Sequence, residues 1–532
     1  MKAIDEQSLG APPEPLPLSL EDRLFEQRYR KISDIEALGF AAYPRNFPFT
    51  HTAREIHSAY GEVDGEQLES KNVQAKVCGR LMTVRRQGKA GFCHIQQEGE
   101  RLQLYVRQDA VGEQVFALYK KLDAGDIIGA EGRLFRTRTG ELTLRTESLE
   151  FLAKAILPMP EKWHGLQDVE IRYRQRYLDL IANPDVRRVF LQRQKLIAAL
   201  RGSLEGRDYL EVETPMMQSI YGGALARPFQ THHNALDLDL YLRIAPELYL
   251  KRLVVGGFDR VYEINRNFRN EGISKQHNPE FTMLEFYQAY SDYRDLMELS
   301  AELLKEAVQA VHDGETAVEY NGQTIDFSSL QRVSMKEAIV EFWPDRETAP
   351  APGDLDDPAR VRQLIEMHNR TKEEKIFLAP DASPGRCLLA LFECACESQL
   401  IQPTLVYDYP VEASPLSKNK PDDPDWVERF EIYAAGMEIA NAYSELNDPR
   451  EQRRRFLAQL SGDEQDADAT HQMDEDYVRS LCYGMPPTAG EGIGIGARFL
   501  PALWSPLGPA SGERKAQNTA EGERGLHDRF MR

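Results

Sequence analysis

The densest group of residues that could do chemistry lies in the run FRNEGISKQHNPEFTMLEFY, residues 268–287. Arg269 and Glu271 are two positions apart, so on a strand their side chains would point to one face. The arginine fork suits a phosphate, and the glutamate can accept a hydrogen bond from an exocyclic amine. Three further candidates follow in the next loop and strand: His277, Asn278 and Phe281. The run predicts a strand–loop–strand unit that holds a phosphorylated purine. The alternative is a surface hairpin with solvated charges, which is the commoner structure for an isolated Arg-x-Glu.

Two glutamates in the run RFEIYAAGMEIANAYSELND, residues 429–448, could bind a divalent cation. Glu431 and Glu438 are close enough in sequence to hold Mg²⁺ jointly with substrate phosphates, which is the usual way in which proteins bind this ion. The alternative is a pair of edge carboxylates that face water, which is common in any acidic protein.

The end of the same run predicts an acidic pocket. Asn441, Tyr443 and Glu445 alternate, so they would share one face of a strand. With Glu247 and Glu285 beside it, Glu445 would give the pocket a negative character that suits an amine-bearing ligand.

A third run, TAGEGIGIG at residues 488–496, places a glycine at every second position from 490 onward. Its spacing matches neither GxxxxGK[ST] nor GxGxxG, so neither nucleotide-binding motif applies. Alternating glycines in a strand predict instead that a ligand approaches the backbone closely.

The segment that precedes these runs alternates with a period of two, as half-buried strands do. Five strands are predicted over residues 73–85, 91–97, 101–107, 126–138 and 141–154. With a helix over 112–122, this order is typical of an OB-fold barrel, which binds single-stranded nucleic acid or oligosaccharide. Basic residues outnumber acidic ones in the first half, as phosphate contact requires, and Phe92 could stack on an unpaired base. A purely structural barrel is the alternative.

The larger part of the chain predicts an α+β domain with an antiparallel sheet and flanking helices. Helices near 188–202 and 293–311 accompany strand-like runs that are separated by turns. The expected organisation is an N-terminal extension at 1–70, the barrel at 71–155, a linker at 156–180, the large domain at 181–500 with an insertion at 312–385, and a disordered tail at 501–532.

Composition restricts the partners only weakly. A chain of 532 residues is long enough for two or three domains. Its net charge of -20 disfavours a nucleic-acid binder as a whole-chain property, but one basic face is sufficient for binding. No apolar stretch approaches the roughly 20 residues that span a bilayer, so no membrane partner is expected. Six scattered cysteines without paired CxxC motifs predict no zinc site and fit reduced thiols in a cytoplasm.

These runs, in this order, resemble the three motifs of class II aminoacyl-tRNA synthetases. The first motif is the long helix and the strand that ends at Pro215, the second is FRNE with its loop, and the third begins with the glycine strand. The stretch from GGALARPFQ to FTMLEFYQAY, together with YPVEASPLSK and EIANAYSELND, is similar to the bacterial lysyl-tRNA synthetases. The resemblance covers about residue 20 to residue 495, and it places the barrel and the purine-binding strands in one enzyme.

The resemblance implies a role for each candidate around ATP and its ion. Arg269 would bind the α-phosphate and Glu271 the adenine amino group, and both count among the implied catalytic residues. The other residues implied to bind ATP are His277 and Asn278 at the phosphates, both also catalytic, Phe281 under the adenine, and Glu431. The implied cofactor is Mg²⁺, with Glu431 and Glu438 as its ligands.

The resemblance also implies how lysine and tRNA are recognised. Glu445 and Tyr287 would hold the lysine ε-ammonium, and Asn441 would orient the carboxylate. The residues around the α-ammonium would be Gly223, Glu247 and Glu285, with Tyr443 at a position that is often Phe in the family. In the barrel, the positions that read the unpaired anticodon bases are Arg85, Phe92, Gln103 and Glu141.

The implied activity is that of a lysine–tRNA ligase. The lysine carboxylate attacks the α-phosphorus of ATP, pyrophosphate leaves, and the 3′-hydroxyl of tRNA(Lys) then attacks the acyl carbon of lysyl-adenylate. Such a site acts by positioning and charge stabilisation, without a covalent enzyme intermediate. The first motif implies a homodimer.

The resemblance ends at Ile495. The family continues with Asp and Arg and then an apolar helix, whereas this sequence continues with Gly496, Ala497 and Arg498 and a proline-containing tail. Ala497 stands at the position of the catalytic arginine, and a slip of one residue turns a strand side chain to the opposite face. We hypothesise a reading-frame change in the gene or its sequencing, and we expect weakened adenylate formation.

Two other functions fit parts of the sequence. An aspartate– or asparagine–tRNA ligase would share the barrel and the second motif, but an acidic pocket disfavours acidic side chains. A catalytically weak or inactive paralog that binds tRNA or lysine would fit the altered third motif.

Overall fold

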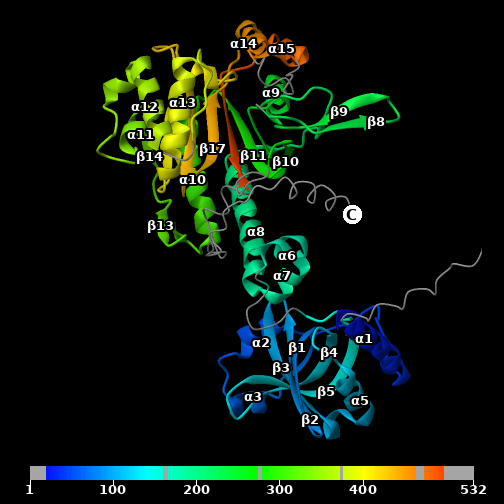
Figure 1. The fold of residues 1–532 in the computed structure, drawn as a ribbon. Coiled ribbons are helices and arrows are strands. Elements are labelled where there is room, and N and C mark those ends of the chain that lie inside the picture. The colour runs from blue at the N-terminus through cyan, green and yellow to red at the C-terminus, as the bar shows by residue number, and fades with distance from the viewer. Residues whose placement is uncertain are drawn as a thin grey trace, which may run out of the picture. The chain divides into compact units, whose positions relative to one another are not determined.

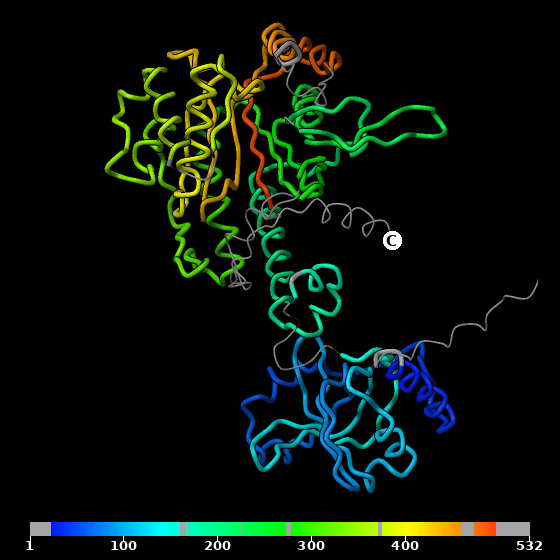
Figure 2. The backbone as a smooth tube through the Cα atoms, in the orientation of Figure 1, coloured from blue at the N-terminus to red at the C-terminus, as the bar shows by residue number. Residues whose placement is uncertain are grey.

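The computed structural model describes residues 20–159, 166, 168–224, 226–272, 278–371, 375–462 and 473–495. The chain divides into two compact units, Met1–Arg188 and Val189–Arg532. Figures 1 and 2 show the two units in a single colour gradient from the N-terminus. His277, the altered third-motif positions Ala497 and Arg498, and the tail from residue 501 lie outside the described residues.

The first unit is built on a closed five-stranded barrel with the strand order β1-β2-β3-β5-β4. Its strands are β1 (Gln74–Gln87), β2 (Ala90–Gln97), β3 (Glu100–Arg107), β4 (Ile127–Arg136) and β5 (Leu142–Ala153). Only β3 and β5 pair in parallel, and the other neighbouring strands are antiparallel. The predicted OB-fold barrel is confirmed.

Helices precede the barrel and also lie between two of its strands. Those before the barrel are α1 (Leu20–Ala37), α2 (Ala53–Tyr60) and α3 (Gly65–Lys71), and those between β3 and β4 are α4 (Gln108–Val111) and α5 (Glu113–Lys121). The helix predicted after the third strand is therefore present, divided in two at Gly112, whose φ of 82° suits glycine. Beyond β5, the fully buried Lys154 ammonium forms ion pairs with Asp123 at 2.6 Å and Asp126 at 2.8 Å.

Three helices connect the barrel to the larger unit in sequence: α6 (Val169–Arg174), α7 (Arg176–Ala182) and α8 (Pro184–Glu205). The larger unit contains an eight-stranded sheet with the order β14-β15-β16-β17-β18-β11-β10-β6. Its strands are β6 (Leu210–Glu211), β10 (Arg260–Phe268), β11 (Glu280–Ala289), β14 (Gln331–Ser334), β15 (Thr404–Pro410), β16 (Trp426–Ala434), β17 (Met437–Ser444) and β18 (Thr488–Gly494). The six central strands are antiparallel as predicted, whereas β6 and β14 pair in parallel at the two edges.

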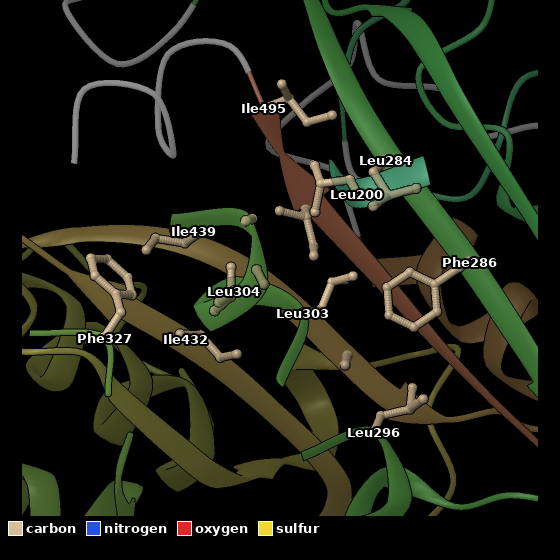
Figure 3. Packing of buried hydrophobic residues seen from close by; sticks show 14 of the residues in the cluster. Leu200, Leu284, Phe286, Leu296, Leu303, Leu304, Phe327, Ile432, Ile439 and Ile495 are labelled. Carbon is tan, nitrogen blue, oxygen red and sulfur yellow. The ribbon is translucent and has the colours of Figure 1, made fainter. Parts of the chain in front are cut away.

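The two faces of this sheet differ in chemistry because side chains alternate along each strand. On one face, Leu284 and Phe286 of β11 and Ile432 of β16 join the largest hydrophobic cluster, against α8 and α10 (Tyr293–Val311). Figure 3 shows this packing, with Ile495 one residue beyond the end of β18. The opposite face carries the polar residues between these positions and holds the candidate site.

Additional elements surround the sheet. A three-stranded sheet contains β7 (Met217–Gln218), β9 (Leu238–Leu242) and β8 (Gln230–His233), and α9 (Glu247–Val255) packs on β10 and β11. The segment 312–385 forms β12 (Ala317–Tyr320), β13 (Gln323–Asp326), α11 (Met335–Glu341) and α12 (Pro358–Thr371), and supplies β14. Later helices are α13 (Pro384–Ala395), α14 (Pro449–Gly462) and α15 (Glu475–Leu481); three short 3₁₀ turns span Pro352–Asp356, Glu397–Gln399 and Val411–Ala413. Within the described residues, no helix combines the length and apolarity needed to cross a bilayer.

Candidate functional site

A pocket of about 380 Å³ lies on the polar face of the central strands in the larger unit. This volume is in the range of small-molecule sites. The structure brings to this one pocket twelve of the predicted residues: Gly223, Glu247, Arg269, Glu271, Asn278, Phe281, Glu285, Tyr287, Glu438, Asn441, Tyr443 and Glu445. The pocket also contains Arg429, which was not predicted although it lies within residues 429–448.

One end of the pocket is strongly acidic. Glu247 of α9, Glu285 of β11 and Glu445 after β17 are all buried, with 4%, 4% and 1% of their surfaces exposed. Burial and the repulsion from Glu247 raise the pKa of Glu285 to about 8, although a hydrogen bond from the Tyr287 hydroxyl opposes this rise. The Tyr443 hydroxyl donates to Glu247 Oε1 at 2.8 Å. The predicted acidic pocket is therefore built of three carboxyl groups and two tyrosines.

A buried lysine, Lys251, contacts two of the carboxyl groups at the acidic end of the pocket. It was not predicted as a site residue. The Lys251 ammonium is fully buried on α9 and forms ion pairs with Glu247 Oε1 at 2.5 Å and with Glu445. Burial lowers the pKa of Lys251, but the attraction of Glu247 and Glu445 outweighs burial and raises it above its ordinary value. The only sequence signal for the contact with Glu247 was the spacing of four residues, which brings a glutamate and a lysine together where the segment is helical, and no helix was predicted there.

The glycine strand β18 forms part of the pocket floor. Gly490 pairs with Tyr287 of β11 on one side and with Tyr443 of β17 on the other. A Cβ atom at Gly490 would overlap the Tyr287 ring and Glu445 Oε1. Gly223 has a φ of 89°, and a side chain there would crowd Glu247. Packing of Tyr287 and Glu445 against this strand therefore requires a glycine at 490, and the close approach of a ligand to the backbone stays a prediction.

The other end of the pocket combines a guanidinium, an aromatic ring and polar groups. Strand β10 ends at Phe268, so Arg269 and Glu271 follow it in the loop that leads to β11. The Arg269 N–H donates to the Pro279 carbonyl at 2.9 Å, which fixes the two ends of this loop to each other. Its guanidinium lies 5.1 Å from the centroid of the Phe281 ring. A planar cation and a ring side by side suit a phosphate and a purine base.

The two proposed magnesium ligands differ in their surroundings. Glu438 lines the pocket, whereas Glu431 lies behind it and accepts hydrogen bonds from Arg429, Tyr433 and, at 2.9 Å, Tyr409. Within the described residues, no cluster of three or more His, Cys, Asp or Glu side chains could hold a metal ion by itself. The residues fit Mg²⁺ that is shared with substrate phosphates, because this ion is usually bound through one or two carboxylates plus phosphate oxygens.

The barrel carries a second group of predicted residues. Exposed Arg85 lies opposite Phe92 in the β1–β2 pairing, and the Phe92 ring stacks on Tyr105 with centroids 4.5 Å apart. Tyr105 in turn lies 6.1 Å from the ring of Phe135. Tyr105 and Phe135 were not selected from the sequence, although Tyr105 aligns with Phe92 in the β2–β3 pairing.

Polar side chains next to these rings form a connected network. Gln103 Nε2 donates to Glu141 Oε2 at 2.7 Å, and the Thr143 hydroxyl donates to Gln103 Oε1 at 2.8 Å. His94 Nε2 lies 2.9 Å from Glu141 Oε1. Stacking surfaces with fixed hydrogen-bonding groups are what proteins use to bind unpaired bases.

Comparison with known proteins identifies both units. Residues 168–503 match the family of class II tRNA synthetases (D, K and N), and residues 75–152 match the OB-fold nucleic acid binding domain. A lysine–tRNA ligase of Carboxydothermus hydrogenoformans is 49% identical over 89% of this chain and 93% of its own length. The lysine–tRNA ligase of Bacillus subtilis is 47% identical over 90% and 93%, and the heat-inducible one of Escherichia coli K12 is 48% identical over 90% and 92%.

The chain belongs to the lysine–tRNA ligase family of class II synthetases. The resemblance inferred from the sequence motifs is therefore confirmed, and the aspartate and asparagine alternatives are not favoured. For a lysine–tRNA ligase, the described pocket provides both an acidic end and an end with a cation beside an aromatic ring.

Proposed function

We propose that this chain is a lysine–tRNA ligase, which activates L-lysine with ATP and transfers the lysyl group to the 3′ end of tRNA(Lys). The observation that carries the proposal is the group of three buried carboxyl groups, Glu247, Glu285 and Glu445, at one end of a pocket whose other end presents Arg269. Buried carboxylates require positive partners, and an amino acid with two ammonium groups supplies them.

The pocket residues orient lysine by charge. Glu445 and Tyr287 would hold the ε-ammonium, while Glu247 and Glu285, together with the backbone space at Gly223, would surround the α-ammonium. Asn441, whose Oδ1 accepts from Arg429 at 3.0 Å, would direct the lysine carboxylate towards ATP. This orientation accounts for the pocket's preference for a basic amino acid.

ATP would lie with its adenine on Phe281 and its amino group at Glu271. Arg269 would contact the α-phosphate, with Asn278 and His277 at the phosphates. The lysine carboxylate oxygen attacks the α-phosphorus, and the bond to pyrophosphate breaks. The 3′-hydroxyl of tRNA then attacks the acyl carbon, and AMP leaves. Positioning and charge stabilisation supply the rate enhancement.

Mg²⁺ would be held by Glu438, which lines the pocket, and by Glu431 behind it. When bound, the ion supplies positive charge to the phosphates. Arg429 supports this arrangement because its guanidinium donates to both Glu431 and Asn441, and so connects the metal end of the pocket to the lysine end.

We infer that the barrel binds the anticodon of tRNA(Lys) through Arg85, Phe92, Gln103 and Glu141. The enzyme would act as a homodimer in the cytoplasm. The six cysteines, all within the described residues, form no disulfide, which is consistent with a reducing compartment. Phe190 and Leu191 of α8, which are 52% and 42% exposed, suit a helix that packs on a second copy. Sedimentation analysis tests the dimer, and Phe190→Glu is expected to shift it towards monomer.

Exchange of pyrophosphate into ATP, dependent on L-lysine, tests the proposed activity. The variant Gly496→Asp/Ala497→Arg restores the residue pair that the family has at the third motif. We expect the exchange rate of this variant to exceed that of the unaltered protein by about 100-fold, because the loss of one charge-stabilising group costs ~3 kcal/mol of transition-state stabilisation. Equal and rapid exchange by both proteins would show that Arg498 replaces the missing arginine.

Controls separate the remaining alternatives. Exchange supported by aspartate or asparagine in place of lysine would contradict the proposed specificity. Lysine binding without exchange in either protein would indicate a non-catalytic binder of lysine and tRNA. Sequencing of the coding DNA around Ile495 tests the reading-frame hypothesis, and an intact frame with a detected tail peptide would reject it.

A further inference from the structure

Lys251 occupies an unusual place for a charged residue. Its side chain is 0% exposed, and its ammonium lies between two carboxylates that come from different elements, Glu247 of α9 and Glu445 after β17. Its nitrogen is also 5.5 Å from the centroid of the Tyr443 ring. A buried ammonium with two carboxylate partners links α9 to the strand that carries the predicted lysine-binding residues.

The two oxygens of Glu445 differ in their partners. Oε2 forms the ion pair with Lys251, whereas the buried Oε1 accepts no hydrogen bond from any residue that the structure describes. Gly490 lies directly against Oε1, because a Cβ atom built on it would overlap this oxygen. Because buried polar atoms are nearly always paired, an unpaired oxygen that faces a pocket indicates a ligand with a donor.

We propose that Lys251 is a positioning residue for substrate lysine: it fixes Glu445 through one carboxylate oxygen and favours the charged form of this carboxylate, so that the other oxygen accepts the substrate ε-ammonium. The proposal rests on the lysine specificity proposed above. Lys251 itself does not contact the substrate in this arrangement. It acts through Glu445.

A count of charges supports this role. Glu247, Glu285 and Glu445 carry three negative charges when ionised, and Lys251 offsets one of them. The remaining two match the α-ammonium and ε-ammonium of one lysine molecule. Without Lys251, three carboxylates would share a buried space, and the repulsion among them would favour protonation of Glu445. A protonated Glu445 must release its proton before it can pair with an ammonium.

The groups that face Glu445 come from four elements. They are Glu247 and Lys251 on α9, Glu285 and Tyr287 on β11, Tyr443 on β17, and Tyr477 on α15. Lys251 is the only cation in this set. Burial, with repulsion from Glu247 and Glu285, raises the pKa of Glu445 well above its ordinary value, and the Lys251 ammonium acts against that rise. Since the pKa of Glu285 is already raised to about 8, lysine binding to the unaltered protein should release a proton there.

Calorimetric titration of the full chain with L-lysine between pH 6 and pH 8.5 tests the proposal without requiring catalysis. We expect Lys251→Met to weaken lysine binding by about 100-fold at pH 7, and the deficit to shrink by about tenfold per pH unit as the pH rises. Titrations in buffers of different ionisation enthalpy should show about one more proton released by the variant than by the unaltered protein. Neither effect is expected of a residue that only supports the fold.

Two further variants keep the test decisive. Lys154→Met removes another fully buried, doubly ion-paired lysine, in the barrel, and should leave lysine binding and proton release unchanged. Lys251→Gln keeps a hydrogen-bond donor beside Glu445 and should also release about one more proton than the unaltered protein, so the proposal can be tested even where the methionine variant fails to fold.

The outcomes distinguish this inference from the proposed function. Binding of L-lysine to the unaltered chain no tighter than binding of norleucine would overturn the lysine specificity, and the role of Lys251 with it. Normal lysine binding by the unaltered chain, with an unchanged proton count in both Lys251 variants, would overturn the role of Lys251 alone. A loss of affinity that is the same at every pH would also overturn it.

Discussion

At the scale of single residues, Glu445 combines burial, an ion pair and an unpaired oxygen in one carboxylate. Glu445→Gln preserves the shape of the side chain and removes its charge. We expect lysine affinity to fall by about 100-fold, in line with the roughly 3 kcal/mol typical of a lost hydrogen-bonded charge pair. ATP binding should be unchanged, because Glu445 is at the acidic end of the pocket. Calorimetry with each ligand separately measures both, and retained lysine affinity would contradict the assignment.

Glu491 shows what the core side of the same sheet does to a carboxyl group. It is buried on β18, its Oε2 accepts from the Ser300 hydroxyl, and burial raises its pKa to about 8 from an ordinary 4.5. Below pH 4.5 the group is protonated in both the folded and the unfolded chain. As the pH rises towards 8, the unfolded glutamate ionises and the folded one does not, so the free energy of unfolding falls.

Glu491→Gln removes this titration. The difference in free energy of unfolding between the variant and the unaltered protein should therefore shift in favour of the variant between pH 5.5 and pH 8, by on the order of 1 kcal/mol per pH unit. Urea unfolding of both proteins at several pH values measures the difference. A difference that does not change with pH would show that Glu491 is ionised in the folded protein.

At the scale of elements, β18 provides a floor without side chains. Gly490→Ala would place a methyl group against Tyr287 and Glu445, so we expect lysine affinity to drop at least tenfold while the fold persists. Gly202→Ala is the matched control, because a Cβ there, on α8, has no neighbour within 4 Å. That change should leave binding unaltered and stabilise the helix by up to ~1 kcal/mol. If both variants bind lysine with the same affinity, the steric role predicted for Gly490 is wrong.

The barrel strands support a parallel prediction for tRNA. Phe92→Ala removes the ring that stacks on Tyr105, and loss of one base-stacking ring costs ~1–3 kcal/mol. Affinity for tRNA(Lys) at fixed salt should fall between about fivefold and 150-fold in a filter-binding assay. Phe49→Ala, an exposed phenylalanine that precedes α2 and lies outside the barrel strands, should bind normally. Equal losses in the two variants would argue against a specific stacking site at Phe92.

The elements show which parts of the fold local sequence could predict. Periodicity placed the helix at 293–311 as α10 has it, and the five barrel strands within a few residues, because each pattern is repeated over several turns or strands. The parallel edge strand β14 was missed because it is only four residues long, and β6, two residues long, covers only part of the strand that the resemblance placed before Pro215. Short strands owe their pairing to distant partners that no local pattern reveals.

The residues of the candidate site were predictable where side chains alternate along a strand, because alternation determines which face of the sheet each side chain occupies. Asn441 and Tyr443 share the pocket face as their spacing required. Glu431 shares that face too, but Arg429, Tyr409 and Tyr433 surround it, and an irregular register between β16 and β17 lies next to it. Lys251 was missed because its partner Glu445 is 194 positions away in the sequence, a contact that only the tertiary fold creates.

At the scale of the whole molecule, a net charge of -20 coexists with a barrel whose exposed Arg85 lies beside aromatic rings. Binding to tRNA should nevertheless weaken as salt rises, because the released counterions depend on local phosphate contacts. Arg85→Gln is expected to reduce the slope of log affinity against log salt by about 0.7–0.9. Filter binding over a salt series measures this slope, and an unchanged slope would show that Arg85 makes no phosphate contact.

The pairing of Lys251 with two glutamates also bears on the design of inhibitors. A compound that enters the acidic end with a single cation would leave one buried carboxylate without a counter-charge, whatever apolar surface it gains. Potency should then follow the number and spacing of basic groups, so that diamines spaced like lysine outperform bulkier monoamines. For the same reason, amino-acid analogues with neutral side chains should bind weakly, because they supply only one positive charge to the buried carboxylates.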